Sequence, residues 1–166
     1  MSLRKKILVV DDDIDVIGTV KAVLDKDYDI ITAHDKVEGL EKARLEKPDL
    51  VILDVMMTTR FEGFEMAKEI VEDPELRHIP VFMQTSIDVL TTTKDSVQEM
   101  VHEYRMMPGY SELDVLLLKN IATGETGVDY MNENGESIWF PVKGFLRKPV
   151  DFEVLNREVR QALQFH

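Results

Sequence analysis

Short runs of apolar residues recur along the chain, each bounded by polar or turn-forming residues and rich in β-branched side chains. They cover residues 7–10, 30–31, 50–53 and 80–83, and a fifth run follows much later at 144–146. Apolar residues in continuous rather than alternating order are typical of strands covered on both faces. We therefore predict strands of a parallel sheet with helices on both sides.

The segments between these runs have the spacing of amphipathic helices. The apolar positions that share a stripe are Ile14, Ile17, Val20, Val23 and Leu24, then Val37, Leu40, Ala43 and Leu45, then Phe64, Ala67, Ile70 and Val71. A final helix is predicted from about residue 150 to 163. Because each parallel crossover passes over the sheet, strands that alternate with helices predict a doubly wound α/β fold.

The alternation breaks after the fourth strand. Residues 88–107 are compatible with a helix that ends at Pro108-Gly109, and residues 108–142 exceed what a simple α/β domain needs. We predict that residues 108–142 form an insertion in a single domain of residues 1–166. The turn dipeptide Asn134-Gly135 lies between two short apolar stretches of this insertion and predicts a β-hairpin.

Composition excludes several classes of protein. The chain of 166 residues has 32 acidic and 20 basic residues, a net charge of −12, and no cysteine. This charge opposes binding to nucleic acid or anionic membranes, and without cysteine there are no disulfides or thiolate metal sites. The first apolar run is too short for a secretory signal and no run is long enough to span a bilayer. We predict a cytoplasmic protein with no direct nucleic-acid or membrane partner.

Polar residues follow four of the predicted strands. They are Asp11, Asp12 and Asp13, then Asp54, then Gln84, Thr85 and Ser86, and finally Arg147, Lys148 and Pro149. In a parallel α/β sheet, binding sites form at the carboxyl ends of the strands. Clustered carboxylates with no histidine or cysteine nearby in sequence predict a hard divalent cation, with Mg²⁺ as the expected ion.

Each of these residues also has a simpler interpretation. The aspartates at 11–13 could cap the helix that begins near Ile14, where acidic side chains are favourable. Asp54 could be a turn residue, Thr85 could bond its own backbone, and Lys148 could be a surface lysine. Their joint occurrence at the ends of separate strands favours a functional site.

Taken in order, the strand ends resemble the receiver domain of two-component response regulators. The matching segments are Ile7-Leu-Val-Val-Asp-Asp12, Leu50-Val-Ile-Leu-Asp-Val-Met-Met57, Thr85 and Phe145-Leu-Arg-Lys-Pro149. The resemblance covers residues 5–107 and 143–164. It implies a flavodoxin-like (βα)₅ domain with a five-stranded parallel sheet, and we expect it to stand alone because the chain ends directly after the fifth helix.

The resemblance implies a phosphorylation site with a metal ion. Asp54 would accept a phosphoryl group from a sensor histidine kinase or a histidine phosphotransfer protein. Asp12 and Asp54 would bind Mg²⁺ directly, Asp11 would act through a bound water, and the backbone carbonyl of Met56 would be a further ligand. Such a protein assists its own phosphorylation and dephosphorylation and is not a dedicated enzyme.

Three further roles follow from the same resemblance. Thr85 would bond the phosphoryl oxygens and Lys148 would pair with them. Phe145 would occupy the place of an aromatic residue that changes rotamer with Thr85, and lacking a hydroxyl it would act only sterically. The bond between Lys148 and Pro149 is expected to be cis.

Two departures from the family pattern concern the surroundings of the site. The loop after Asp54 lacks the usual proline, is one residue longer up to Gly63, and carries Arg60 near the acidic residues. The insertion at 108–142 holds six acidic residues and one lysine, counted from Pro108 to Pro141. It could dock an unknown downstream protein, block the usual surface, or be a tolerated loop.

Exposed aromatic side chains on the insertion would favour docking. Trp139, Phe140 and Tyr130 are the residues concerned, because aromatic anchors dominate protein interfaces. Two alternative functions remain for the whole chain. One is a haloacid-dehalogenase-like phosphatase with Asp11 as its nucleophile, and the other is a pseudo-receiver that binds partners without phosphorylation.

Overall fold

The computed structural model describes residues 4–57, 62–93, 96–109, 113–132 and 134–164. The chain forms two compact units, each with its own sheet. The first consists of Met1–Ser86 together with Phe145–His166, and the second is Ile87–Gly144. Within the described ranges no helix has the length and apolar character needed to cross a bilayer.

The first unit is the predicted doubly wound α/β fold. Its elements are β1 (Lys6–Val10), α1 (Ile14–Leu24), β2 (Asp29–Ala33), α2 (Lys36–Glu46), β3 (Leu50–Asp54), α3 (Glu62–Glu72), β4 (Val81–Thr85), β9 (Gly144–Arg147) and α5 (Phe152–Gln164). The sheet has the order β2-β1-β3-β4-β9, and β1 pairs in parallel with both β2 and β3. The apolar runs at residues 7–10, 30–31, 50–53, 80–83 and 144–146 all lie in or at the start of these strands.

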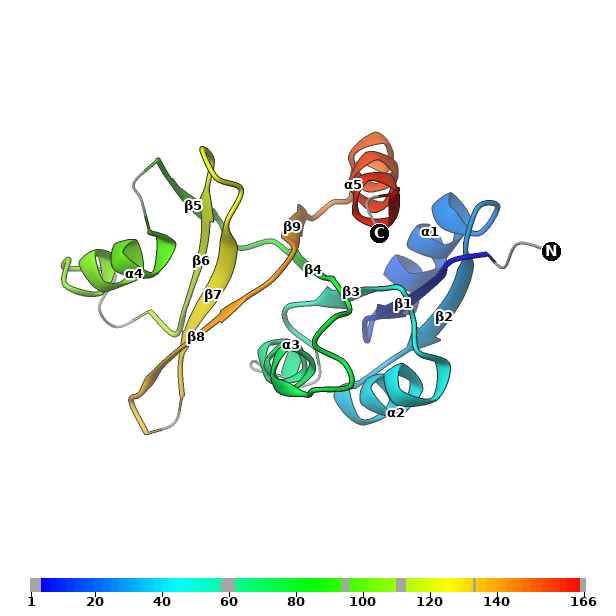
Figure 1. The fold of residues 1–166 in the computed structure, drawn as a ribbon, viewed down its shortest axis with the longest axis horizontal. Helices are drawn as coiled ribbons and strands as arrows, with labels where there is room; N and C mark the ends of the chain where they lie inside the picture. The colour runs from blue at the N-terminus through cyan, green and yellow to red at the C-terminus, as the bar shows by residue number, and fades with distance from the viewer. Residues whose placement is uncertain (1–3, 58–61, 94–95, 110–112, 133, 165–166) are drawn as a thin grey trace. The chain divides into compact units, whose positions relative to one another are not determined.

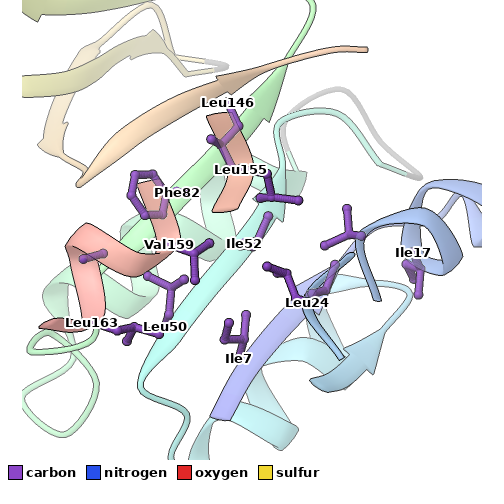
Figure 2. Packing of buried hydrophobic residues seen from close by; sticks show 13 residues of the cluster. Ile7, Ile17, Leu24, Leu50, Ile52, Phe82, Leu146, Leu155, Val159 and Leu163 are labelled. Atoms are coloured by element: carbon purple, nitrogen blue, oxygen red, sulfur yellow. The ribbon is translucent and has the colours of Figure 1, made fainter. Parts of the chain in front are cut away.

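Helices cover both faces of this sheet. Figure 1 shows α1 and α5 on one side and α2 and α3 on the other. On the first side a buried cluster joins the sheet to α1 and α5, as Figure 2 shows with Ile52 between Leu24 of α1 and Leu155 of α5. On the second side α2 lies so close to α3 that a side chain at Gly39 would meet Met66.

Three of the residues assigned to helix stripes are wrong as core positions. Ile14, Val37 and Leu45 are exposed, at 69%, 74% and 75%. Ile14 and Val37 lie in the first turns of their helices and Leu45 near the end of α2. The stripe identified the helices correctly, but it did not separate these exposed positions from buried ones such as Leu24 at the end of α1.

The second unit is a four-stranded sheet with one helix. Its elements are β5 (Val89–Thr92), α4 (Val97–Arg105), β6 (Val115–Asn120), β7 (Thr126–Met131) and β8 (Ser137–Pro141). The strand order is β5-β6-β7-β8, with β5 parallel to β6 and the other neighbours antiparallel. The predicted hairpin around Asn134-Gly135 is confirmed as β7 and β8, and Gly135 has the positive φ of 78° that the turn requires.

The helix predicted over residues 88–107 requires correction. Its first part is strand β5, and the remainder, α4, packs on β6 and β7 of the second sheet. The second unit therefore begins at Ile87, well before the insertion predicted at 108–142. Strand β6 was not predicted, although it contains three consecutive leucines.

The aromatic residues of the hairpin belong to the packing of the second unit. Tyr130 and Phe140 are 6% and 3% exposed, and their rings meet edge to face with centroids 6.1 Å apart. Trp139 is half-buried against the cluster between α4 and the sheet, and one of its ring atoms lies where a side chain on Gly127 would stand. The exposed aromatic anchors that would have favoured docking are therefore not found on this hairpin.

Candidate functional site

The predicted site residues meet at the carboxyl edge of the five-stranded sheet. Asp11 follows β1, Asp54 ends β3, Thr85 ends β4 and Lys148 follows β9. In the sheet, β2 lies on one side of β1, whereas β3 and the later strands lie on the other side. The order in which strands are added therefore reverses between β1 and β3, and the carboxyl edge at this topological switch point is where ligands bind in such folds. The parallel arrangement brings together residues that lie far apart in the sequence.

Three carboxylates at this edge can hold a metal ion. Asp11, Asp12 and Asp54 each offer an oxygen, and these oxygens lie within 4.8 Å of one another. Asp11 is buried, and its Oδ1 accepts a hydrogen bond of 2.9 Å from the backbone N–H of Asp13. Its Oδ2 is buried and accepts no hydrogen bond from the described residues. A buried carboxylate oxygen that accepts no hydrogen bond fits a hard cation such as Mg²⁺.

Asp13 has the simpler role considered for all three aspartates at 11–13. It is the N-cap of α1, and its Oδ1 accepts a hydrogen bond of 2.9 Å from the backbone N–H of Asp15. The acidic run therefore divides, with Asp11 and Asp12 at the cluster and Asp13 at the helix start. The sequence pattern alone did not separate these roles.

Lys148 is ion-paired with the acidic cluster. Its Nζ lies 2.7 Å from Asp54 Oδ1 and 3.5 Å from Asp11 Oδ2. Its backbone N–H donates to the Thr85 carbonyl at 2.9 Å, which holds the end of β9 beside β4. The bond between Lys148 and Pro149 is cis, as expected.

Burial shifts the proton affinities of these charged groups. It raises the pKa of Asp54 from its ordinary 3.8 to about 6, because the hydrogen bond from Lys148 offsets only part of the lost solvation and the charge of Asp11 adds to the rise. Burial likewise raises the pKa of Asp11. For Lys148, burial alone would lower the pKa, but the hydrogen bond and negative charge of Asp54 outweigh it, so the pKa is raised.

The structure places the remaining predicted residues near this edge without testing their roles. Thr85 is 2% exposed, and Phe145 is half-buried in β9. Met56 lies two residues beyond β3, with its side chain 48% exposed. Arg60 and the rest of residues 58–61 lie outside the described residues.

Two residues of this region gained no role from the sequence. Gly63 stands so close to β3 that a Cβ atom there would lie 2.1 Å from the carbonyl oxygen of Asp54, so only glycine fits. Gln84 is 1% exposed and pairs in register with Asp54 across β3 and β4. Its position between an apolar strand and Thr85 was the available signal, since amides are seldom fully buried.

The fold and this arrangement define a class of protein, and comparison with known sequences agrees. Residues 7–106 match the response regulator receiver domain family. The chain belongs to this family, as the resemblance at the strand ends had indicated.

Individual relatives and structures support the assignment. The chain is 31% identical over 117 residues to protein PilH of Pseudomonas aeruginosa, covering 70% of this chain and 93% of PilH. It is 40% identical over 87 residues to the alkaline phosphatase synthesis transcriptional regulatory protein PhoP of Bacillus subtilis, covering 52% of this chain but 35% of PhoP. The chemotaxis response regulator CheY4 of Vibrio cholerae has a similar structure, with a TM-score of 0.59 and 25% identity, covering 97% of this chain and 100% of that one.

Proposed function

We propose that this receiver domain accepts a phosphoryl group on Asp54 in a reaction that depends on Mg²⁺. The observation that carries the proposal is the position of the Asp54 carboxylate, which is nearly buried, bonded to Lys148 and adjacent to two further carboxylates. Such a cluster of charges at a strand end is costly to maintain and is typical of a reactive site. With a pKa of about 6, the Asp54 carboxyl group is ionised in most molecules at pH 7 and can act as a nucleophile.

The site residues have different roles in phosphoryl transfer. Asp54 attacks the phosphorus of a phosphohistidine, its oxygen forms the new P–O bond, and the P–N bond to the donor imidazole breaks. Lys148 offers its positive charge to the oxygens of the transferring group. Asp11, Asp12, Asp54 and the Met56 carbonyl would hold Mg²⁺, which when bound neutralises charge on the phosphoryl oxygens.

The partners that we propose are a sensor histidine kinase or a histidine phosphotransfer protein, and a downstream protein that responds to phosphorylation. In this role the chain is a phosphoacceptor that assists its own chemistry rather than an enzyme with turnover on a separate substrate. The absence of cysteine fits a reducing compartment, and on that ground we propose a cytoplasmic location.

The connections between the two units support a role of the second unit in the response. The chain leaves the first unit at Ser86, directly after Thr85, and returns to it at Phe145. Both predicted switch residues therefore adjoin a connection to Ile87–Gly144. We propose that movement of Thr85 toward a phosphoryl group, with the steric response of Phe145, changes the surface that the second unit offers to the downstream protein.

Phosphorylation with a small donor tests the proposal. The protein is incubated with acetyl phosphate and Mg²⁺, and the acyl phosphate is located by intact mass and peptide mapping. We expect a label on Asp54 that is absent in Asp54→Asn and absent when Mg²⁺ is removed by a chelator. Gln161→Met, a substitution at an exposed position of α5, serves as the matched control and should be labelled as the wild type is.

Two other outcomes would contradict the proposal. A label on Asp11 would support the phosphatase alternative. Binding of Mg²⁺ without any label would support a pseudo-receiver that acts without phosphorylation.

A further inference from the structure

Four adjacent strands of the first unit end in polar side chains on one face of the sheet. The cluster beneath α1 and α5 takes every second residue of these strands, namely Ile7 and Val9 in β1, Leu50 and Ile52 in β3, Phe82 in β4 and Leu146 in β9. Side chains alternate along a strand, so the residues two positions further on lie on the same face. Those residues are Asp11, Asp54, Gln84 and Lys148.

Gln84 is the member of this row to which neither the sequence nor the proposed function assigns a role. It is the register partner of Asp54, and neighbouring strands of a sheet lie about 4.8 Å apart. The two side chains therefore stand next to each other at the end of the same buried face. Gln84 is also 1% exposed, so water does not reach most of its amide group.

The amide of Gln84 has an unused donor. Its Nε2 is buried and has no hydrogen-bond partner among the described residues, and the other buried side-chain atom in this condition is Asp11 Oδ2. A buried donor without a partner destabilises the folded state. Both atoms belong to the same row of residues, on either side of Asp54. A buried donor without a partner beside a reactive carboxylate is a candidate for a role in the reaction.

We propose that Gln84 donates a hydrogen bond to the Asp54 carboxyl group during the phosphoryl reaction and thereby shortens the lifetime of the acyl phosphate. The inference rests on the proposed function. In hydrolysis the oxygen of water bonds to phosphorus, the P–O bond to Asp54 breaks, and its electron pair returns to the carboxylate. The protons of the water leave with the phosphate and the solvent.

The amide donor favours this bond cleavage because negative charge develops on its acceptor. A hydrogen bond to a charged oxygen is roughly twice as strong as one to a neutral oxygen, so the contact strengthens as the phosphoryl group leaves. Loss of the donor should therefore slow hydrolysis. It should not slow phosphorylation, because a carboxylate that accepts fewer hydrogen bonds is at least as nucleophilic.

The lifetime of the acyl phosphate tests the inference. The protein is labelled with acetyl phosphate and Mg²⁺, the donor is removed, and the loss of label is followed by intact mass. Gln84→Met has a similar volume and no donor, and its half-life should be about three- to thirtyfold longer than that of the wild type. The rate of labelling should be equal or higher, and Gln161→Met should leave both rates unchanged.

A measurement on the wild type avoids dependence on the folding of the variant. The side-chain N–H₂ resonances of Gln84, assigned by their absence in Gln84→Met, are followed by NMR as Mg²⁺ and beryllofluoride are added. We expect one amide proton to shift downfield as the phosphoryl analogue binds. If backbone signals around Asp54 move while those of the Gln84 amide do not, the inference is wrong.

The result also separates this inference from the proposed function. A wild type without label on Asp54 would overturn both. A labelled wild type whose half-life is the same in Gln84→Met would overturn the role of Gln84 and leave Asp54 as the phosphoacceptor.

Discussion

Among the described residues, each unit has a largely buried basic side chain paired with aspartate, Lys148 in the first unit and Arg105 in the second, and the two networks differ in completeness. In the second unit Arg105 Nε lies 2.8 Å from Asp129 Oδ2, the other Asp129 oxygen accepts from the Ser137 hydroxyl, and Arg105 also donates to the Leu113 carbonyl. In the first unit Lys148 lies 2.7 Å from Asp54 and 3.5 Å from Asp11 Oδ2, and that Asp11 oxygen accepts no hydrogen bond from the described residues. The network around Asp129 stabilises the packing of the second unit, whereas the network around Lys148 leaves a carboxylate oxygen that can bind a ligand.

Sheet direction explains why the incomplete site is in the first unit. Parallel strands all end at one edge, so residues that follow β1, β3 and β9 meet there. In the second unit successive antiparallel strands end at opposite edges, and residues at strand ends are dispersed. Its charged pair instead crosses from α4 to the middle of β7, where it supports packing.

Removal of the cation from each pair should give the largest contrast. Arg105→Met leaves Asp129 buried and without its cation, and should destabilise the second unit by about 3–5 kcal/mol. Trp139, the single tryptophan, packs in the core of that unit, so its fluorescence during urea unfolding reports the effect. The double variant Arg105→Met with Asp129→Leu should recover most of the stability. A loss below 1 kcal/mol in the single variant would show that the pair is not structural.

Lys148→Met is the counterpart in the first unit. Asp54 can take up a proton when its cation is lost, because its pKa is already about 6, so we expect an unchanged Trp139 transition. The rate of phosphorylation by acetyl phosphate should fall about a hundredfold, as for other groups that stabilise charge in a transition state. Equal phosphorylation in the variant and the wild type would remove Lys148 from the mechanism.

One glycine in each unit lies too close to its neighbours for a side chain, and substitution of the two glycines provides a second, smaller contrast between the units. Gly63→Ala places a Cβ 2.1 Å from the Asp54 carbonyl oxygen, and Gly127→Ala places one 2.3 Å from the Trp139 ring. Each should cost about 1–3 kcal/mol, with altered phosphorylation only in the first and an altered Trp139 transition only in the second. Gly18→Ala, in open space on α1, is the control and should stabilise the helix by about 0.5–1 kcal/mol. Indistinguishable stabilities of the three variants would contradict the contact geometry.

A further expected effect is a dependence of stability on pH without Mg²⁺. The pKa of Asp54 is raised from 3.8 to about 6 in the folded protein, so between these values the folded state holds a proton that the unfolded state has released. The contribution of Asp54 to stability should therefore fall as the pH rises from about 4 to about 6 and then stay constant. Unfolding of the first unit in urea at several pH values, compared with Asp54→Asn, measures this slope. An identical slope in the variant would exclude Asp54 as its source.

The secondary structure of the first unit was largely predictable, and that of the second was not. Continuous apolar runs identified all five strands of the parallel sheet because every one of them is covered by helices on at least one side. Residues 88–107 have apolar positions that suit a helix, but Val89–Thr92 instead pairs with β6. A strand of four residues depends on its partner more than on its own propensity, so the sequence did not reveal it.

The sequence predicted which residues form the candidate site, but it did not predict the role of each one. The positions of Asp11, Asp54 and Lys148 at strand ends were sufficient to predict that they meet. The sequence did not distinguish Asp13, which caps α1, from its two acidic neighbours. It also assigned no role to Gln84, because only the tertiary structure shows that the amide donor has no hydrogen-bond partner among the described residues.

The sequence by itself determined the parallel sheet, its helices and the set of acidic and basic residues at the strand ends. These features follow from local apolar patterns and from the rule that parallel strands share one edge. Only the tertiary structure decided that Ile87–Gly144 forms a unit of its own and that, among the described residues, the donor of Gln84 and an oxygen of Asp11 have no hydrogen-bond partner. Strand pairing and hydrogen-bond satisfaction depend on residues distant in the chain, and a local pattern does not contain that information.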